Sequence, residues 1–394
     1  MESKRPYVAY FDLLRVVAIF TVVAVHLSAQ HWPDVDVHSR AWFAFNLYCS
    51  LGKWSVPIFV MISGALFLGR DTDVNTILKK NVLRIAIVFL VWSGAYALID
   101  LVFYRDTLFG AFSQFVSGHY HLWFLFMIAG LYLIVPLLRP IVRDDRLTRY
   151  FLLLALIFTF LLPQLALFVS FVSPRLSNLI STVIMYTYLY FPLGFTVYFV
   201  GGYYLSRREF SRKEELVLYA AGITGLFFSV FASLAYAKMQ GAASDLFYTY
   251  NSLNILFSSV PIFVFAKQHL NFPHMGDRAR AILRTLSKYS FGVYLVHPMV
   301  IELLQHFGID TFSCNAFFSV PLLALLVFAV SLAISAVLNR IAAKIRNIFA
   351  GLHSKISLGS DIFMILKEMI DDLCRIHIIC LLIHMTFDTG IELL

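Results

Sequence analysis

Charged residues are scarce in this chain of 394 residues: Asp, Glu, Lys and Arg together make up only 14% of it. Soluble domains contain about 25% charged residues, so this composition argues against a large soluble core. Hydrophobic residues reach 60%, with 39 phenylalanines among them, and apolar runs recur from one end to the other. Because about 20 apolar residues suffice to span a bilayer, the sequence predicts an all-α, polytopic integral membrane protein.

Cysteine is equally rare, with four residues: Cys49, Cys314, Cys374 and Cys380. They form no CxxC pair and have no histidines at metal-ligand spacing, so we expect neither structural zinc nor a disulfide framework. His377 and His384 share one helical face of the tail, but no carboxylate stands at a matching step, and we predict no metal site there. The net charge of +8 is typical of membrane topology, so no nucleic-acid partner is expected.

A window of about 20 residues predicts ten membrane spans. They cover residues 9–29, 41–68, 82–104, 121–138, 150–171, 181–205, 216–236, 248–267, 287–306 and 316–338. The first run is too long for a signal peptide and lacks a small-residue cleavage site, so we expect it to stay in the chain. Residues 1–346 are thus predicted to form one transmembrane domain, and residues 347–394 a cytoplasmic or interfacial tail with room for one further helix.

Positive charge gathers in every second loop. The basic loops hold Lys4, Arg5, Arg70, Lys79, Lys80, Arg139, Arg143, Arg146, Arg149, Arg207, Arg208, Arg212, Lys213, Arg278, Arg280, Arg284, Arg340, Lys344 and Arg346. The alternating loops hold only Arg40, Arg105, Arg175 and Lys238. Because positively charged loops stay on the cytoplasmic side, we predict a cytoplasmic N-terminus and a multi-pass protein of the cell inner (plasma) membrane.

The first predicted span carries an arginine and a histidine. An ionisable group inside a membrane costs at least about 2.5–3.5 kcal/mol, so such groups indicate function. Arg15 and His26 are eleven residues apart, which returns to within about 20° of the same helical face after a rise of about 16 Å. Arg15 reaching lipid headgroups and His26 bonding to another helix is the simpler alternative. Their shared face favours a single polar cavity.

Two later spans carry polar residues as well. Lys53 lies near the middle of the second predicted span, where an amine needs a partner. Ser63 stands toward the cytoplasmic end of that span, where a small residue allows either a ligand or another helix to approach. His297 lies halfway through the ninth predicted span, and Glu302 follows it on a rather different face of the same helix.

Further candidates stand at the ends of the spans. At the predicted cytoplasmic end, Arg84 enters the third span after Lys79 and Lys80, and clustered cations suit a phosphate-rich ligand. The positive-inside rule explains the two lysines equally well. At the external end, the fourth span opens with His119 and His121, at an interface where aromatic-rich belts are normal. A purely interfacial role is favoured for His119, and less so for His121.

Four motifs resemble those of the membrane-bound acyltransferase-3 family and occur in the family's order. They read "DLLRVVAIFTVVAVH", "SVPIFVMISGALF", "HYHLWFLFMIAGLYLIVPLL" and "YSFGVYLVHPMVI". The resemblance covers residues 8 to about 346, and within the family the WecH-like O-acetyltransferase branch is the most similar. It implies that His26 is the essential histidine, that Arg15 is its motif partner, and that Arg84 belongs to a basic cytoplasmic motif whose first arginine is replaced here by Asn81.

The resemblance implies a membrane O-acyltransferase. Such an enzyme moves an acetyl or similar short acyl group from cytoplasmic acetyl-CoA to a hydroxyl of a cell-surface or lipid-linked glycan, among membrane lipids. We expect Arg15, Arg84, Lys80 and Ser63 to bind the donor. The pantetheine arm of CoA is roughly 15–20 Å long, comparable to the rise from Arg15 to His26.

The expected catalytic residues are His26, His297 and Lys53. His26 acts either as a general base on the acceptor hydroxyl or as a nucleophile that is itself acylated, and we favour the base. His297 or Lys53 then stabilises the oxyanion. No metal is expected. A proton-coupled transporter is the alternative, because it also carries buried ionisable groups, but no internal repeat supports it.

Overall fold

The computed structural model describes residues 8–103, 107–189, 193–270, 272 and 274–356, and its regular secondary structure there is helical throughout. In chain order the elements are α1 (Ala9–Ala29), α2 (Arg40–Gly52), α3 (Ser55–Phe67), α4 (Val74–Thr76), η1 (Ile77–Val82), α5 (Leu83–Phe103), α6 (Leu108–Ser117), α7 (Trp123–Arg143), α8 (Asp145–Ala155), η2 (Leu156–Leu161), α9 (Leu162–Ser170), α10 (Pro174–Tyr186), α12 (Thr196–Arg207), α13 (Arg212–Gln240), α14 (Leu253–His269), α15 (Asp277–His306) and α16 (Ala316–Ile356). The elements η1 and η2 are π-helical turns.

Seven helical stretches of the described chain are long and apolar enough to cross a membrane. This confirms the predicted all-α, polytopic architecture. Single helices do not match all ten predicted spans, however. The span predicted at 41–68 is broken into α2 and α3, and the one predicted at 181–205 is divided between the shorter helices α10 and α12. Hydropathy averages over such breaks, so the number of crossings stays a prediction.

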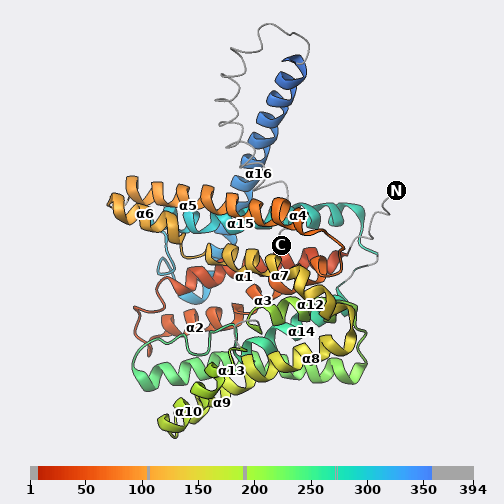
Figure 1. The fold of residues 1–394 in the computed structure, drawn as a ribbon. Helices are drawn as coiled ribbons and strands as arrows, with labels where there is room; N and C mark the ends of the chain where they lie inside the picture. Colours follow the sequence, from red (N-terminus) through yellow and green to blue (C-terminus); the bar gives the residue numbers. More distant parts are fainter. Residues whose placement is uncertain (1–7, 104–106, 190–192, 271, 273, 357–394) are drawn as a thin grey trace.

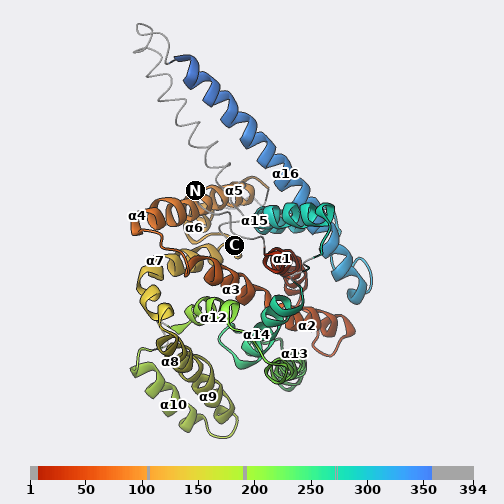
Figure 2. The same ribbon diagram turned by 90° about the vertical axis from the view of Figure 1, so that its right-hand side faces the viewer.

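The helix that carries Arg15 and His26 lies in the middle of the bundle. α1 packs against α2, α3, α14, α15 and α16, and Figure 2 shows these helices around it. In Figure 1 most long helices run in one common direction across the body. An apolar helix surrounded by others on most sides can hold polar side chains, because they face protein rather than lipid.

The two ends of this bundle differ in charge. One end, called here the basic end, includes an Arg143–Asp71 ion pair and a bond from Lys267 to the backbone oxygen of Arg208. α1 and α15 begin at this end (Figure 1). The opposite end includes the loops 30–39 and 307–315, which meet where His31 Nε2 lies 4.0 Å from Asp310 Oδ2.

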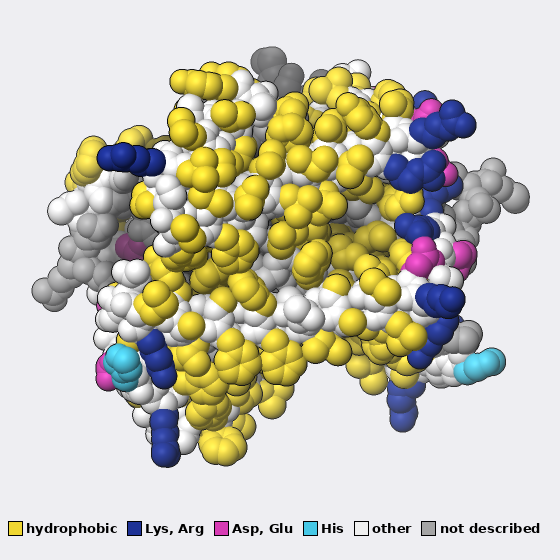
Figure 3. All heavy atoms as spheres, turned by 90° about the horizontal axis from the view of Figure 1, so that it is seen from below, with side chains coloured by type: hydrophobic (Ala, Val, Ile, Leu, Met, Phe, Trp, Pro, Cys, Tyr) yellow, Lys and Arg dark blue, Asp and Glu magenta, His cyan; other side chains and the backbone are white. Residues whose placement is uncertain are grey.

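An apolar surface separates the two charged ends. Figure 3 shows hydrophobic side chains over the middle of one face, and Lys and Arg side chains gathered toward its two opposite edges. Such a band is what a bilayer requires of the protein surface that it contacts. We therefore expect the membrane normal to run along the helices that share this common direction, from the basic end to the opposite end.

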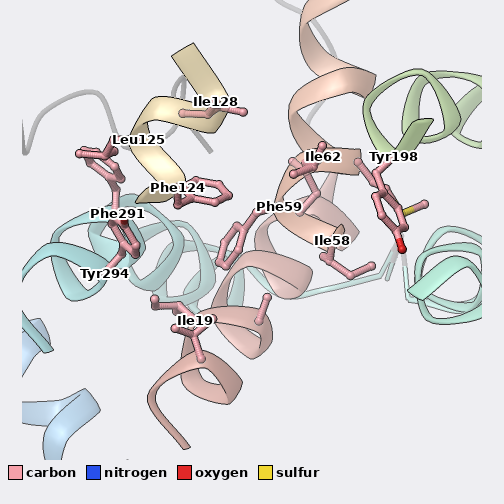
Figure 4. Packing of buried hydrophobic residues seen from close by; sticks show 14 of the residues in the cluster. Ile19, Ile58, Phe59, Ile62, Phe124, Leu125, Ile128, Tyr198, Phe291 and Tyr294 are labelled. Carbon is pink, nitrogen blue, oxygen red and sulfur yellow. The ribbon is translucent and has the colours of Figure 1, made fainter. Parts of the chain in front are cut away.

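Aromatic side chains fill much of the interior between α3, α7 and α15. Phe59 and Phe124 point toward one another from α3 and α7, with ring centroids 6.2 Å apart, and Tyr294 approaches Phe124 from α15 at 5.7 Å (Figure 4). All three side chains are less than 10% exposed. They form a rigid support beside the polar residues of α1 and α15.

The last described helix extends past the bundle. α16 continues to Ile356 and rises away from the other helices (Figure 1). The predicted tail at 347–394 therefore starts within this helix. Residues 357–394, including His377 and His384, lie outside the described part of the chain.

Candidate active site

Two polar contacts join α1 to α15. Near the basic end, the Ser287 hydroxyl donates to Asp12 Oδ1 at 2.7 Å. Deeper in the bundle, His26 Nδ1 and His297 Nε2 are 3.0 Å apart. Because Asp12 precedes His26 and Ser287 precedes His297, the two helices run parallel. The sequence placed His26 and His297 in the same predicted site, and the structure brings them into direct contact.

The hydrogen bonds of His297 define which ring nitrogens carry protons when both imidazoles are neutral. His297 is fully buried, and its Nδ1 lies 3.0 Å from the carbonyl oxygen of Val293, which can only accept. His297 Nδ1 is therefore the protonated nitrogen, and its Nε2 accepts a bond from His26 Nδ1–H. This leaves His26 Nε2 with a lone pair.

A small pocket lies beside His26. Its cavity volume is about 40 Å³, and most of its lining is aliphatic or aromatic. The lining residues are Val22, Val25, His26, Gly52, Lys53, Ser55, Val56, Phe59, His121, Trp123, Phe124, Tyr250 and Tyr294. An apolar pocket with a few convergent polar groups is the usual form of a small-molecule site.

Lys53 enters this pocket from the break between α2 and α3. A helix interrupted at membrane depth is tolerated where the break lines a cavity. The Lys53 ammonium lies 5.3 Å from the ring centroid of Tyr248 and 5.7 Å from that of Tyr250. These cation–π contacts supply the partner that the sequence required for an amine inside a membrane. The amine is thereby held beside the pocket.

Three residues that the sequence did not assign to the site also lie here. His119 Nε2 is 3.0 Å from Glu302 Oε1, and His119 Nδ1 is 2.9 Å from His121 Nδ1. His121 is 2% exposed and lines the pocket. The expectation that an interfacial belt accounts for His119 and His121 therefore misses their burial against other polar groups.

A signal for this second chain was present in the sequence. Two histidines stand two residues apart directly before α7, and an acidic residue lies inside a predicted span. Helical periodicity correctly separates Glu302 from His297, because five residues correspond to about 140° of rotation. The same periodicity says nothing about a partner on another segment, and that partner is His119.

The predicted donor-binding cations lie toward the basic end. Arg15 is 2% exposed, and its Nη1 forms an ion pair with Asp12 Oδ1 at 3.1 Å. Arg84 is half-buried in the first turn of α5, and Lys80 is exposed on η1. Arg15 thus lies inside the bundle on the helix that carries His26, whereas Arg84 and Lys80 stand on α5 and η1.

Ser63 lies in the interface between α3 and α12 and is not part of the pocket lining. Its hydroxyl donates to the Phe59 carbonyl at 2.9 Å, and the residue is 1% exposed. A Cβ atom at Gly64 would stand 1.8 Å from the carbonyl oxygen of Phe199 on α12. Of the two roles that the sequence allowed here, this geometry favours close helix packing over donor binding.

The described residues contain no group of three or more His, Cys, Asp or Glu side chains positioned to hold a metal ion. The histidines are therefore interpreted through their hydrogen bonds. They form two chains, Val293–His297–His26 and Glu302–His119–His121, and each chain ends at a residue that lines the pocket.

Comparison with known proteins adds a family assignment. The model of the acyltransferase-3 family, described as an acyltransferase domain, matches residues 8–340. No curated protein and no solved structure matches the chain. The matched segment runs from the start of α1 into α16 and includes both histidine chains, Lys53 and the cations of the basic end. The chain therefore belongs to the acyltransferase-3 family of membrane acyltransferases.

Proposed function

We propose that this acyltransferase is a membrane O-acetyltransferase, which moves the acetyl group of acetyl-CoA to a hydroxyl of a cell-surface or lipid-linked glycan. Family membership supports acyl transfer in general. The observation that carries the catalytic proposal is the Val293–His297–His26 chain, because it fixes the tautomer that leaves His26 Nε2 as a proton acceptor in a pocket-lining residue.

His26 acts as the general base. The acceptor hydroxyl gives its proton to His26 Nε2 while its oxygen attacks the thioester carbonyl carbon, and the carbon–sulfur bond then breaks. A base that a second group orients in this way is the usual arrangement for activating a hydroxyl. His297 serves as that orienting group. Its Nδ1 proton is engaged by Val293 and its Nε2 accepts from His26, which favours this role over oxyanion stabilisation.

Lys53 stabilises the oxyanion. Its ammonium carries three N–H donors on a pocket-lining residue, and the aromatic faces of Tyr248 and Tyr250 hold it without neutralising its charge. A fixed cation beside a pocket of low polarity is most effective where negative charge develops, here on the carbonyl oxygen of the tetrahedral intermediate.

The donor is bound from the basic end. Lys80, Arg84 and Arg15 supply cations for the phosphates of CoA, and the two cations on η1 and α5 are the more accessible ones. The helical rise of about 16 Å from Arg15 to His26 matches the reach of the pantetheine arm. With the positive-inside rule, this arrangement supports a cytoplasmic basic end in the inner membrane.

The pocket volume supports a short acyl group. The cavity beside His26 is only about 40 Å³, which suits a transferred group of few heavy atoms. An acetyl group has three. A longer acyl chain requires the aromatic lining residues to move.

The test uses membrane vesicles that contain the full-length protein and [14C]acetyl-CoA, with label counted in the extracted glycan fraction. We expect His26→Gln to reduce labelling at least about 100-fold, within the range for loss of a general base. His38→Gln, which changes an exposed histidine of the opposite end, serves as the control and should label normally. Normal labelling by His26→Gln overturns the catalytic assignment, and labelling no higher than in vesicles without the protein overturns the proposed function.

A further inference from the structure

A second histidine chain reaches the pocket and has no role in the steps described above. We propose that Glu302, His119 and His121 form a proton path, and that His121, at its inner end, is the general acid that protonates the departing sulfur of the acyl donor. This inference rests on the proposed function and assigns a further catalytic residue and two positioning residues to it.

The geometry connects the three side chains in a single line. Glu302 Oε1 meets His119 Nε2 at 3.0 Å, and His119 Nδ1 meets His121 Nδ1 at 2.9 Å. These two contacts use both ring nitrogens of His119 and the Nδ1 of His121. Of the four ring nitrogens, His121 Nε2 is left. That atom is buried, has no hydrogen-bond partner within 3.5 Å among the described residues, and belongs to a pocket-lining residue.

Neighbouring groups fix the position of these rings. The His119 ring stacks on Tyr96 at 4.2 Å with an interplanar angle of 9°. The Tyr294 hydroxyl donates to the backbone oxygen of His121 at 2.7 Å. Such supports are what a group needs if it is to act at a defined point in the pocket.

The chain has two complete hydrogen-bonding patterns that differ by one proton. With Glu302 ionised, His119 Nε2–H donates to the carboxylate, His121 Nδ1–H donates to His119 Nδ1, and His121 Nε2 is bare. With Glu302 protonated, its O–H donates to His119 Nε2, His119 Nδ1–H donates to His121 Nδ1, and His121 carries a proton on Nε2. In the second pattern, called here the loaded pattern, His121 Nε2 carries a proton that it can donate in the pocket.

The loaded pattern places one proton on Glu302, at the outer end of the chain. Its second oxygen, Oε2, is buried and has no hydrogen-bond partner among the described residues. The side chain as a whole remains 20% exposed, so it can exchange its proton with water after each turnover.

The proton balance of the reaction then closes. As the carbon–sulfur bond breaks, the sulfur takes the Nε2 proton of His121, His121 Nδ1 takes the Nδ1 proton of His119, and His119 Nε2 takes the proton of Glu302. Glu302 is left ionised, while His26 holds the proton of the acceptor hydroxyl. His26 releases that proton to water, Glu302 takes one from water, and the net products are the acetyl ester and free CoA.

The test compares acetyl-CoA turnover in H2O, D2O and their mixtures for the full-length protein in vesicles. The proposal predicts a curved dependence of kcat on the deuterium fraction for the wild type, because several protons move when the thiol leaves. We expect Glu302→Gln and His119→Gln to lower kcat about 10–100-fold with KM unchanged, and to make the dependence linear. His306→Gln, an exposed histidine on the same helix, is the matched control.

The outcomes separate this inference from the proposed function. Wild-type protein without acetyl transfer overturns the proposed function. Wild-type transfer with variants that keep either the wild-type kcat or the curved dependence overturns the proton path alone. Because Glu302 stands at the outer end of the chain and Gln preserves its shape, Glu302→Gln tests the proton path without changing the pocket lining at His121.

Discussion

A cation inside a membrane protein needs groups that replace water, and Lys53 obtains them from two tyrosine rings. Neither Tyr248 nor Tyr250 can neutralise the ammonium in the way that a carboxylate would. The charge of Lys53 therefore stays available to whatever enters the pocket. Its position at the break between α2 and α3 also places the lysine in the lining of the pocket.

At this scale we predict the effect of removing that charge. Lys53→Met preserves most of the side-chain length but removes the cation, so kcat for acetyl transfer should fall about 10²–10³-fold. KM for acetyl-CoA should change little, because the phosphates bind elsewhere. Lys238→Met, at an exposed lysine outside the pocket, should leave both constants unchanged. A Lys53→Met enzyme with altered KM and normal kcat would contradict the oxyanion assignment.

At the residue scale, the sequence could predict relations within one helix. Arg15 and His26 could be placed on one face of α1 because periodicity determines it. The contact of His119 with Glu302 joins residues 183 positions apart in number, and no pattern in a single helix reports such a pairing. The hydrogen-bonded network of Glu302, His119 and His121 could therefore not be predicted from the sequence.

At the scale of helices, α3 and α12 approach each other closely. The Gly64 position faces the backbone of Phe199, and a Cβ atom at Gly202 would stand 2.1 Å from the carbonyl oxygen of Met61. Each helix thus places a glycine against the backbone of the other. α3 also carries Phe59 into the pocket lining, so this interface positions one wall of the site.

Gly64→Ala should destabilise the protein. The added methyl group overlaps backbone atoms, which cannot rotate away, and overpacking of this kind costs about 1–3 kcal/mol or more. We expect a clear decrease of Tm for the detergent-solubilised protein. Gly130→Ala is the matched control, since a Cβ atom there meets nothing within 4 Å, and alanine is the better helix former. Equal Tm values for the two variants would show that the α3–α12 contact is looser than described.

Element boundaries were predicted less well than element existence. Long apolar runs predicted α1, α7, α13 and α16, because a helix that spans a bilayer needs about 20 apolar residues. The breaks within 41–68 and 181–205 occur in segments that remain apolar on average. They depend on a cavity and on neighbouring helices, which hydropathy does not record.

At the scale of the whole molecule, the charge difference between the two ends predicts the orientation in the membrane. Cys314 is exposed in the loop 307–315 of the opposite end, whereas Lys213 is exposed at the basic end. The positive-inside rule places the first outside the cytoplasm and the second within it. Both sites can be tested with one reagent.

We predict that a membrane-impermeant maleimide labels Cys314 in intact spheroplasts. The protein would carry Cys374→Ser and Cys380→Ser, so that the tail does not contribute. A second variant, with Cys314→Ser and Lys213→Cys, should be labelled only after lysis. The buried Cys49 serves as the internal background in both proteins. The reverse labelling pattern would invert the orientation and place the donor-binding cations on the wrong side of the membrane.

The two contacts between α1 and α15 also set a mechanical condition on the site. The Asp12–Ser287 and His26–His297 contacts both join the parallel helices α1 and α15. One contact lies near the basic end and the other at the pocket. A slip of a single helical turn, about 5.4 Å, exceeds the tolerance of any hydrogen bond and would undo both contacts together. The alignment of the His26 imidazole therefore depends on the register of two whole helices, and the contact near the basic end fixes that register as much as the contact at the pocket does.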